Sequence, residues 1–251
     1  MTLSVDLNAD MGESFGPWVM GNDLALLDIV TSANIACGMH AGDWDVMAAT
    51  MQAAMERNVQ IGCHPGFADL HGFGRQRMQL PRASLGNLIR YQMGASIGMA
   101  RALGAKVEHL KLHGALANMC AEDKDMARTA YEAALSVDPD ITIYVIAATQ
   151  QQAAAEELGC GWAGEIFADR AYNEDATLVD RKLPGAVIHD ADQAAARVCD
   201  MVKEGALITT SGARIETRID TICMHGDTPE AVEIARKTRH ALEAAGIKVG
   251  R

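Results

Sequence analysis

The sequence predicts one α/β domain, residues 1–251, folded as a β/α barrel of about seven strands, a variant of the TIM barrel. Strand patterns and helix patterns alternate along the whole chain, which is typical of a parallel sheet covered by helices. No linker rich in Pro, Ser and Gly divides the chain. The number of alternations favours a closed barrel, and an open doubly wound sheet is the alternative.

The first half of the chain begins this alternation. Leu24 and Leu27 recur at helical spacing behind Asp23. Asp43 stands where a helix N-cap is expected, and Pro81 suits the first turn of a long helix. The predicted strands are residues 3–8, 33–37, 59–62 and 107–112. The predicted helices are residues 17–32, 44–57 and 81–103.

The second half continues the same pattern. The segment 141–147 is rich in β-branched residues, as strands are, and Gly159 suits the end of a helix. Ser211-Gly212 indicates the turn of a hairpin, and residues 172–189 have no regular period. The predicted strands are residues 141–147, 164–168, 206–211, 214–218 and 221–224. The predicted helices include residues 123–135, 150–158, 191–204 and 228–245.

Composition limits the function classes. Apolar residues make up 49% of the chain and charged residues 22%, as in an ordinary globular protein. The net charge of −11 argues against non-specific binding to nucleic acid or to an anionic membrane. No apolar run reaches the ~20 residues that span a bilayer, and the N-terminus lacks a basic segment followed by an apolar one. We therefore expect a cytoplasmic enzyme with dispersed, reduced cysteines.

One long segment, residues 62–78, has neither a helical nor a strand period. It holds His64, His71, Arg75 and Arg77 among several glycines. A loop this rich in polar chemistry is more often a working loop than a connector. We expect His64 to reach the site, Gly74 and Arg75 to belong to a flap over the substrate, and His71 to be a secondary candidate.

The strongest functional signal lies at the ends of the predicted strands. In parallel α/β folds the reacting groups collect at the carboxyl ends of the strands. Four of the eight histidines stand at such ends, close to a glycine. The polar residues at these ends are Asp6, Asn8, Asp10, Glu13, His40, Asp43, His64, Lys111, His113, Asp169, Arg170, His225 and Asp227.

The alternation of side chains along a strand sharpens this prediction. Asp6, Asn8 and Asp10 share one face of their strand, whereas Val5 and Leu7 share the other. If the apolar face meets the helices, the polar face lines the barrel interior. Buried charges are tolerated when they pair, bind metal or do chemistry.

Other candidates have simpler structural explanations. Asp43 is equally well explained as a helix N-cap, and His109 as a core histidine. His240 lies inside the last predicted helix and is expected on the surface. Arg75 and Arg77 are equally well explained by surface ion pairs.

Three kinds of chemistry fit the residues at the strand ends. Histidines and aspartates are able to bind a divalent metal that activates water. Alternatively, Asp6 or Asp10 acts as a general base and a histidine as a general acid without metal. In phosphoryl transfer, Lys111 or Arg75 would stabilise phosphate oxygens. Phosphate-binding glycine motifs and a serine-nucleophile elbow are absent from the sequence, so any nucleotide is expected in an unconventional loop or on another subunit.

Several ordered motifs together resemble the LamB/YcsF family of 5-oxoprolinase A-type subunits. They are DLNADMGESFG at 6–16, SANIACGMHAGD at 32–43, the segment 62–78, KLHGAL at 111–116, FADR at 167–170 and CMHGDTP at 223–229. The resemblance implies a seven-stranded barrel similar to that of polysaccharide deacetylases. It also implies ATP-dependent opening of 5-oxo-L-proline (pyroglutamate) to L-glutamate, with Mg and ATP held on or shared with two partner subunits of the B and C types.

For this activity the strand-end argument predicts defined roles. Asp6, Asn8 and Asp10 would orient and deprotonate water, His40, His64, His113 and His225 would move protons, and Lys111 with Arg75 would neutralise the oxyanion. The substrate would be bound by Glu13, Gly74, Arg75, Asp169 and Arg170. Leu112 and Ala117 depart from the proline and tyrosine usual in the family. The alternatives are a metal-dependent deacetylase acting alone and a non-catalytic subunit that binds 5-oxoproline.

Overall fold

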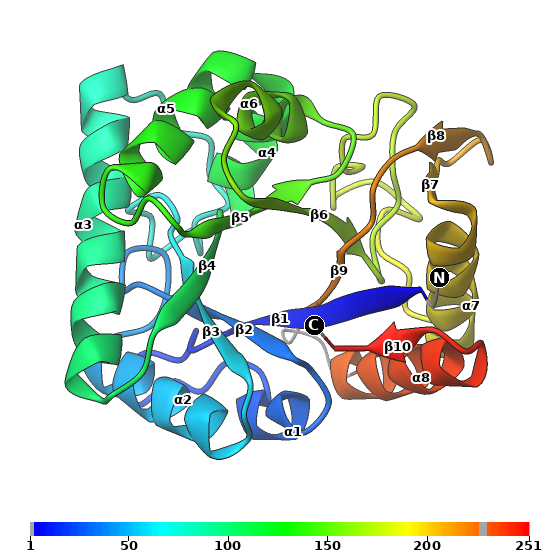
Figure 1. The fold of residues 1–251 in the computed structure, drawn as a ribbon, viewed down its shortest axis with the longest axis horizontal. Helices are drawn as coiled ribbons and strands as arrows, with labels where there is room; N and C mark the ends of the chain where they lie inside the picture. Colours follow the sequence, from blue (N-terminus) through cyan, green and yellow to red (C-terminus); the bar gives the residue numbers. More distant parts are fainter. Residues whose placement is uncertain (1–2, 226–229, 251) are drawn as a thin grey trace.

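The computed structural model describes residues 3–225 and 230–250, which form a closed barrel of parallel strands (Figure 1). β9 pairs with both β6 and β1, through Glu165↔Thr221 and Asp6↔Thr221, and this pairing closes the barrel. The closed barrel predicted from the sequence is therefore confirmed. The strands in barrel order are β1 (Ser4–Met11), β2 (Ser32–Ala36), β3 (Gln60–His64), β4 (Val107–Lys111), β5 (Thr142–Ile146), β6 (Trp162–Phe167) and β9 (Thr221–Met224).

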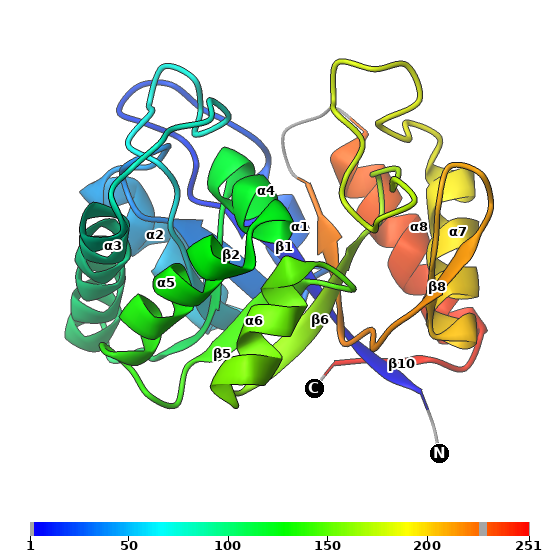
Figure 2. The ribbon, with the colours of Figure 1, turned by 90° about the horizontal axis from the view of Figure 1, so that it is seen from above.

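Helices surround the barrel, and the loops gather at one end of it. The loops that follow β1, β3 and β6 lie on one face, whereas both chain ends lie on the opposite face (Figure 2). A short strand, β10 (Lys248–Val249), extends the sheet beside the start of β1. The helices are α1 (Asp23–Leu27), α2 (Trp44–Glu56), α3 (Arg82–Ala102), α4 (Gly114–Glu122), α5 (Lys124–Leu135), α6 (Gln150–Leu158), α7 (Ala191–Glu204) and α8 (Ala231–Ala244).

The outer faces of the strands form the hydrophobic core with the helices. Leu7, Ala9 and Met11 of β1 are fully buried in this core, and their neighbours Asn8 and Asp10 belong to the polar interior. This alternation follows from the two-residue period of a strand. It confirms the prediction that the polar positions of β1 line the inside of the barrel.

The helix predicted at residues 17–32 was largely wrong. Only Asp23–Leu27 is helical. Phe15 and Trp18 instead exchange two backbone hydrogen bonds of 2.9 Å, and this tight turn competes with a helix start. Ser32 already belongs to β2, where it pairs with Gln60.

Other elements differ less from the prediction. α4 was missed, because it begins directly after the strand-end motif at His113 and is separated from α5 by Asp123, which N-caps α5. The hairpin of β7 (Ala206–Ile208) and β8 (Arg214–Glu216) is confirmed. The N-cap at Asp43 is also confirmed, because its side chain accepts from the amides of Asp45 and Val46.

Asp227 and the predicted helix start at residue 228 lie outside the described residues. Within the described chain, no helix is long and apolar enough to cross a bilayer.

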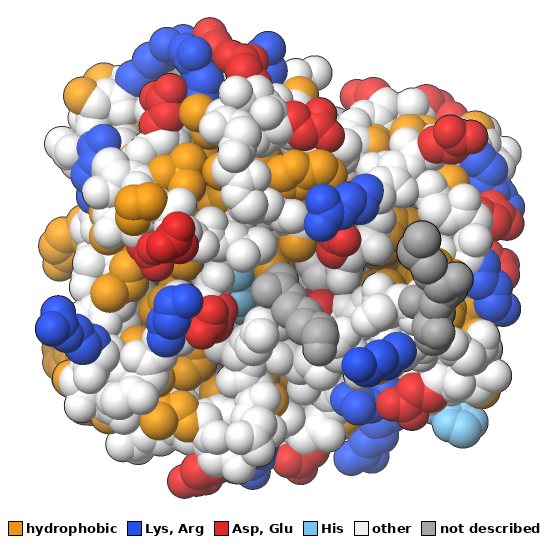
Figure 3. Space-filling model, viewed as in Figure 1, with side chains coloured by type: hydrophobic (Ala, Val, Ile, Leu, Met, Phe, Trp, Pro, Cys, Tyr) orange, Lys and Arg blue, Asp and Glu red, His pale blue; other side chains and the backbone are white. Residues whose placement is uncertain are grey.

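Basic and acidic side chains are interspersed on the face seen in Figure 3, which carries the chain ends. Binding to nucleic acid needs a continuous basic field. The face seen in Figure 3 therefore lacks such a field among its described residues.

Candidate active site at the carboxyl ends of the barrel strands

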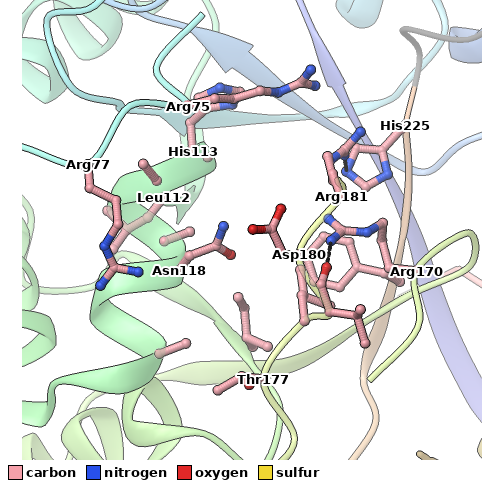
Figure 4. A pocket seen from close by; sticks show the side chains of 18 of the residues that line it. Arg75, Arg77, Leu112, His113, Asn118, Arg170, Thr177, Asp180, Arg181 and His225 are labelled. Atoms are coloured by element: carbon pink, nitrogen blue, oxygen red, sulfur yellow. Dashed lines mark hydrogen bonds between the residues drawn. The ribbon is translucent and has the colours of Figure 1, made fainter. Parts of the chain in front are cut away.

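A pocket of ≈ 690 Å³ opens where the barrel strands end. Arg75, Arg170 and Arg181 border it together with His113 and His225 (Figure 4). The chain carries a net charge of −11, yet the pocket lining has six Lys and Arg residues against four Asp and Glu residues. A locally positive pocket in an acidic protein suits a small anionic ligand.

A network of amides leads from the barrel interior to the floor of this pocket. Asn34 Nδ2 donates to Asn8 Oδ1 at 2.7 Å and to Asp10 Oδ1 at 2.9 Å. His109 Nε2 lies 2.8 Å from Asn34 Oδ1, and its ring packs on Tyr144 at 4.1 Å. The amide of Asn34 holds Asp10 in place. His109 is a buried core histidine, which is the structural explanation considered above.

Lys111 is the buried cation at the pocket floor, with 3% of its surface exposed. Its Nζ lies 2.7 Å from Asp10 Oδ1, 3.0 Å from Glu165 Oε1 and 2.9 Å from Cys223 Sγ. Burial by itself would lower the pKa of Lys111, but Asp10, Cys223 and Glu165 raise it well above its ordinary value. Lys111 is therefore charged in the folded protein.

The pKa values of the two carboxyl groups beside Lys111 are shifted in opposite directions. Burial would raise the pKa of Asp10, but His64 and Lys111 hold it well below its ordinary value. Burial raises the pKa of Glu165, against the attraction of Lys111. Asp10 is therefore the carboxylate that keeps its charge most readily. We did not predict Glu165 from the sequence. Its position as a charged residue inside an apolar strand was a signal that could have identified it.

Three histidines from different strand ends meet beside Asp10. His40 stacks on His113 with 3.7 Å between ring centroids and an angle of 7° between the rings. His64 Nε2 lies 3.0 Å from His113 Nδ1 and 3.3 Å from Asp10 Oδ2. Burial and His64 lower the pKa of His113 to about 3. Glu13 Oε1 lies 3.7 Å from both His40 Nε2 and His113 Nδ1.

His225 forms a second site on the other side of the pocket. Its Nδ1 lies 2.7 Å from Asp169 Oδ1, and Arg181 Nη2 lies 3.0 Å from its Nε2. Burial would raise the pKa of Asp169, but His225, Arg181 and Arg170 lower it. Asp169 thus orients the imidazole of His225 rather than facing a ligand directly.

Asp169→Asn is expected to lower the free energy of unfolding at pH 7 by about 1–3 kcal/mol, because buried donors lose a charged acceptor. A carboxylate whose folded pKa is lowered stabilises the protein above its unfolded pKa of about 3.9 and loses this effect as the pH falls through the folded value. The difference between variant and wild type should therefore shrink below about pH 4.

Urea titrations at pH 7 and pH 3.5 would measure this difference. Asp192→Asn is a matched control, because Asp192 forms an exposed pair with Lys237 at 2.8 Å. A difference between Asp169→Asn and wild type that is equal at both pH values would contradict the assignment.

The structure places Asp6 below the pocket, where hydroxyl groups surround its carboxylate. Its carboxylate accepts hydrogen bonds from the hydroxyls of Thr31, Ser32, Tyr144 and Thr221, at 2.6–3.0 Å. These bonds occupy both oxygens and join four strands or loops of the barrel. We therefore expect Asp6 to serve barrel closure, and its role in water activation stays a prediction that the Asp6→Asn variant tests.

Of the remaining predicted residues, Gly74 and Arg75 lie at the pocket, whereas Arg170 mainly contacts a loop. Gly74 lies against the histidines: a Cβ there would come within 2.7 Å of His40 Cβ and 2.8 Å of His113 Cδ2. Arg75 lines the pocket and covers the ring of Phe73 at 4.9 Å. Arg170 donates to the carbonyls of the loop after β6, Nη2 to Val179 at 2.6 Å, so its main contacts are structural.

The exposed histidine of the 62–78 segment, His71, does not line the pocket. His64, in contrast to the exposed His71, is fully buried. The segment therefore contributes to the site through His64, Gly74 and Arg75. The roles predicted for these residues in binding and proton transfer stay predictions.

Comparison with known proteins finds relatives that match along nearly the whole chain. A protein of Ruegeria pomeroyi, named as the A-type subunit of 5-oxoprolinase, is 66% identical over 245 residues, which cover 98% of this chain and 97% of that protein. The crystal structure of a lactam utilization protein from Thermus thermophilus aligns with a TM-score of 0.92 and 38% identity, over 99% of both chains.

A family 4 carbohydrate esterase from Streptomyces lividans shares the fold at a TM-score of 0.52 and 12% identity, covering 99% of this chain and 92% of that one. The family model of LamB/YcsF matches residues 5–251. The chain, with its seven-stranded barrel and its histidines at the strand ends, belongs to the LamB/YcsF family.

Proposed function

We propose that this chain opens the lactam ring of 5-oxo-L-proline to give L-glutamate, as one subunit of an ATP-hydrolysing 5-oxoprolinase. The name of the relative from Ruegeria pomeroyi supports the substrate. The observation that carries the proposal is the pair of Asp10 and Lys111, joined at 2.7 Å on the floor of a pocket with a cationic border. This pair offers a carboxylate and a cation to one reacting centre.

The five-membered amide is stable, and phosphorylation of its oxygen by ATP makes the ring carbon electrophilic. Water then adds to that carbon, the C–N bond breaks as the nitrogen takes up a proton, and a second water releases phosphate from the new carboxyl group. The products are glutamate, ADP and phosphate. The protein must orient water, stabilise negative oxygen and supply a proton to nitrogen.

We assign a residue of the pocket to each of these tasks. Asp10 is charged and held by Lys111 at 2.7 Å, so it would orient water and accept its proton. Lys111 would balance the charge that develops on oxygen. His225, whose Nδ1 is held by Asp169 at 2.7 Å, would give the proton to the leaving nitrogen once Arg181, which donates to its Nε2 at 3.0 Å, turns to the ligand and Nε2 takes up a proton. Arg75 would bind the carboxylate or phosphate of the ligand at the pocket border.

ATP and Mg are proposed to bind on partner subunits of the B and C types or at a site shared with them. The sequence has no glycine motif of the common nucleotide-binding loops.

Trp18, Val19 and Leu24 are exposed on the segment after β1, and Trp44 is exposed beside it. Asp43 ties the two segments together by accepting from the amide of Gly16 at 2.7 Å. Exposed aromatic groups of this kind suit a protein partner. The predicted cytoplasmic location stays a prediction.

The decisive experiment measures glutamate formed from 5-oxoproline by this chain alone, by its partner subunits alone and by all of them together, with and without ATP. We expect glutamate only from the complete mixture with ATP. Glutamate formed equally well without this chain would overturn the proposal. Titration of the chain with 5-oxoproline separates a catalytic subunit from one that only binds, when it is combined with the Asp10 variant discussed below.

Gly74→Ala is expected to slow glutamate formation by at least about tenfold, because a misplaced catalytic group costs far more rate than stability. Gly74 has a φ of +64°, which disfavours alanine, and its new methyl would displace His40 and His113. The measurement is kcat in the complete mixture.

Gly98→Ala provides the matched control, since a methyl there meets nothing within 4 Å. This helical position in α3 should gain about 0.5–1 kcal/mol of stability and keep its rate. Equal rates for the two variants would show that Gly74 does not hold the histidines in place.

A further inference from the structure

His64 and His113 belong to a chain of hydrogen-bonded groups that runs from the end of β4 to the segment 62–78. His64 Nδ1 lies 2.8 Å from the carbonyl oxygen of Lys111, and His64 Nε2 lies 3.0 Å from His113 Nδ1. His113 Nε2 lies 2.8 Å from the carbonyl oxygen of Phe73. These distances are typical of hydrogen bonds, so every ring nitrogen of the pair takes part in one.

Two neutral imidazoles do not carry enough hydrogens for this chain. A carbonyl oxygen only accepts, so His64 Nδ1 and His113 Nε2 each need a hydrogen, and a neutral imidazole has only one N–H. The central contact between His64 Nε2 and His113 Nδ1 needs a further hydrogen, since two lone pairs would otherwise face each other at 3.0 Å. The chain of hydrogen bonds is complete when the pair holds one proton more than two neutral rings.

Two carboxyl groups face the central contact and favour a positive charge there. Asp10 Oδ2 lies 3.3 Å from His64 Nε2, whereas Glu13 Oε1 lies 3.7 Å from His113 Nδ1. The shorter distance favours the extra hydrogen on His64. Burial and the neighbouring His64 lower the pKa of His113 to about 3, which agrees with a neutral His113. The surroundings therefore suit a protonated His64 beside a neutral His113.

The other charged and titratable groups around the pair fit the same distribution. His40 meets His64 edge-on with 5.5 Å between ring centroids, and burial holds the pKa of His40 well below its ordinary value, so His40 is neutral. Lys111 Nζ is paired with Asp10 at 2.7 Å. The groups that face the pair from the elements packed against it are Asp10, Glu13, His40, Arg75 and Lys111.

The backbone of Phe73 is shaped so that its carbonyl meets His113. Phe73 has a φ of +54°, which is rare for a bulky side chain, and the amide of Arg75 closes this turn on the carbonyl of Gly72 at 2.9 Å. Residues held in such a conformation cluster at functional sites. Phe73 and His113 both line the pocket. A ligand that takes the place of the Phe73 carbonyl would therefore accept from His113 Nε2.

We propose that His64 and His113 share one excess proton and that His113 donates a proton from Nε2 to the ligand in the pocket. In this step the His113 Nε2–H bond breaks and the hydrogen binds to a basic atom of the ligand, while the hydrogen on His64 Nε2 moves to His113 Nδ1. Both rings are then neutral, and a proton from solvent restores the pair. His113 is the catalytic residue, and His64, which acts through it, is a positioning residue.

This donor lies on the opposite side of the pocket from His225. Its part in catalysis rests on the proposed function, whereas the excess proton rests on the hydrogen bonds alone.

Nitrogen NMR of the full chain tests the excess proton. The histidines are labelled with the heavy nitrogen isotope, and spectra are recorded at pH 7 without ligand. Nitrogens with and without a hydrogen resonate far apart, so the hydrogens on each ring are counted directly. We expect one bare nitrogen in the pair, on His113. Two bare nitrogens would overturn the proposal.

His64→Gln and His113→Gln assign the signals, and correlations to the backbone amides of wild type assign them if a variant does not fold. His240→Ala is the matched control, because His240 is exposed on α8. It should remove the signals of one ring and leave those of the pair unchanged.

His64→Gln also tests the role of the pair in the reaction. Gln keeps an N–H for His113 Nδ1 but holds no excess proton. We expect kcat for glutamate formation in the complete mixture to fall at least about tenfold. Binding of 5-oxoproline should stay within about twofold of wild type. His113→Gln should have a similar effect on kcat and serves if His64→Gln does not fold.

The His240→Ala control should keep the wild-type rate. Folded His64→Gln or His113→Gln that forms glutamate at the wild-type rate would overturn the role of the pair. If wild type formed no glutamate, the proposed function would fail, and the count of hydrogens would still decide whether the pair holds an excess proton.

Discussion

Lys111→Met is expected to lower kcat for glutamate formation by about 100- to 1,000-fold, because it removes the cation that faces the developing oxyanion. The same change should lower the free energy of unfolding by about 3–5 kcal/mol. Asp10 and Glu165, at 2.7 Å and 3.0 Å from Lys111 Nζ, would be left in the barrel without their common partner. Rates in the complete mixture and urea titrations of the single chain measure the two effects.

A second variant separates catalysis from folding. Adding Glu165→Gln to Lys111→Met removes one of the stranded carboxyl groups, so part of the lost stability should return. The rate should stay low, because the cation is still missing. If the double variant regained rate together with stability, Lys111 would be a structural residue only.

Much of the site was predictable because a parallel barrel brings strand ends together. The motif around His113 and the one around His40 are separated by about seventy residues of sequence, yet their rings stack at 3.7 Å. The strands that precede them, β2 and β4, both pair with β3, and this order places the two histidines at neighbouring strand ends. The inward direction of Asn8 and Asp10 followed from the two-residue period of β1.

Depth along the barrel axis was not predictable in the same way. Asp6 and Asp10 lie on one face of β1, but only the structure shows that Asp6 is enclosed by hydroxyls and that Asp10 reaches the pocket. The alternation of side chains predicts which face of a strand a residue occupies. It does not predict how far along the barrel axis that residue lies. The pairing of Arg181 with His225 at 3.0 Å was equally hidden, because Arg181 belongs to a segment without a regular period.

Asp10→Asn is expected to lower kcat by about 100- to 10,000-fold, the range for loss of a general base. Asn keeps the size of the side chain and an oxygen for Lys111 and Asn34, which lie at 2.7 Å and 2.9 Å from Asp10 Oδ1. What it removes is the charge that draws a proton from water. Binding of 5-oxoproline should therefore persist while glutamate formation stops.

Asp6→Asn is the matched control, since it makes the same chemical change on the same face of β1. Four hydroxyls converge on Asp6, so this variant should lose stability by about 1–3 kcal/mol and keep most of its rate when folded. A reversal, with Asp10→Asn active and folded Asp6→Asn inactive, would move the general base below the pocket and contradict the site described above. The comparison therefore tests which end of β1 does the chemistry. It also distinguishes two uses of a buried carboxylate in this barrel. Asp6 joins the strands through neutral hydroxyl donors, whereas Asp10 forms an ion pair with Lys111 at the pocket.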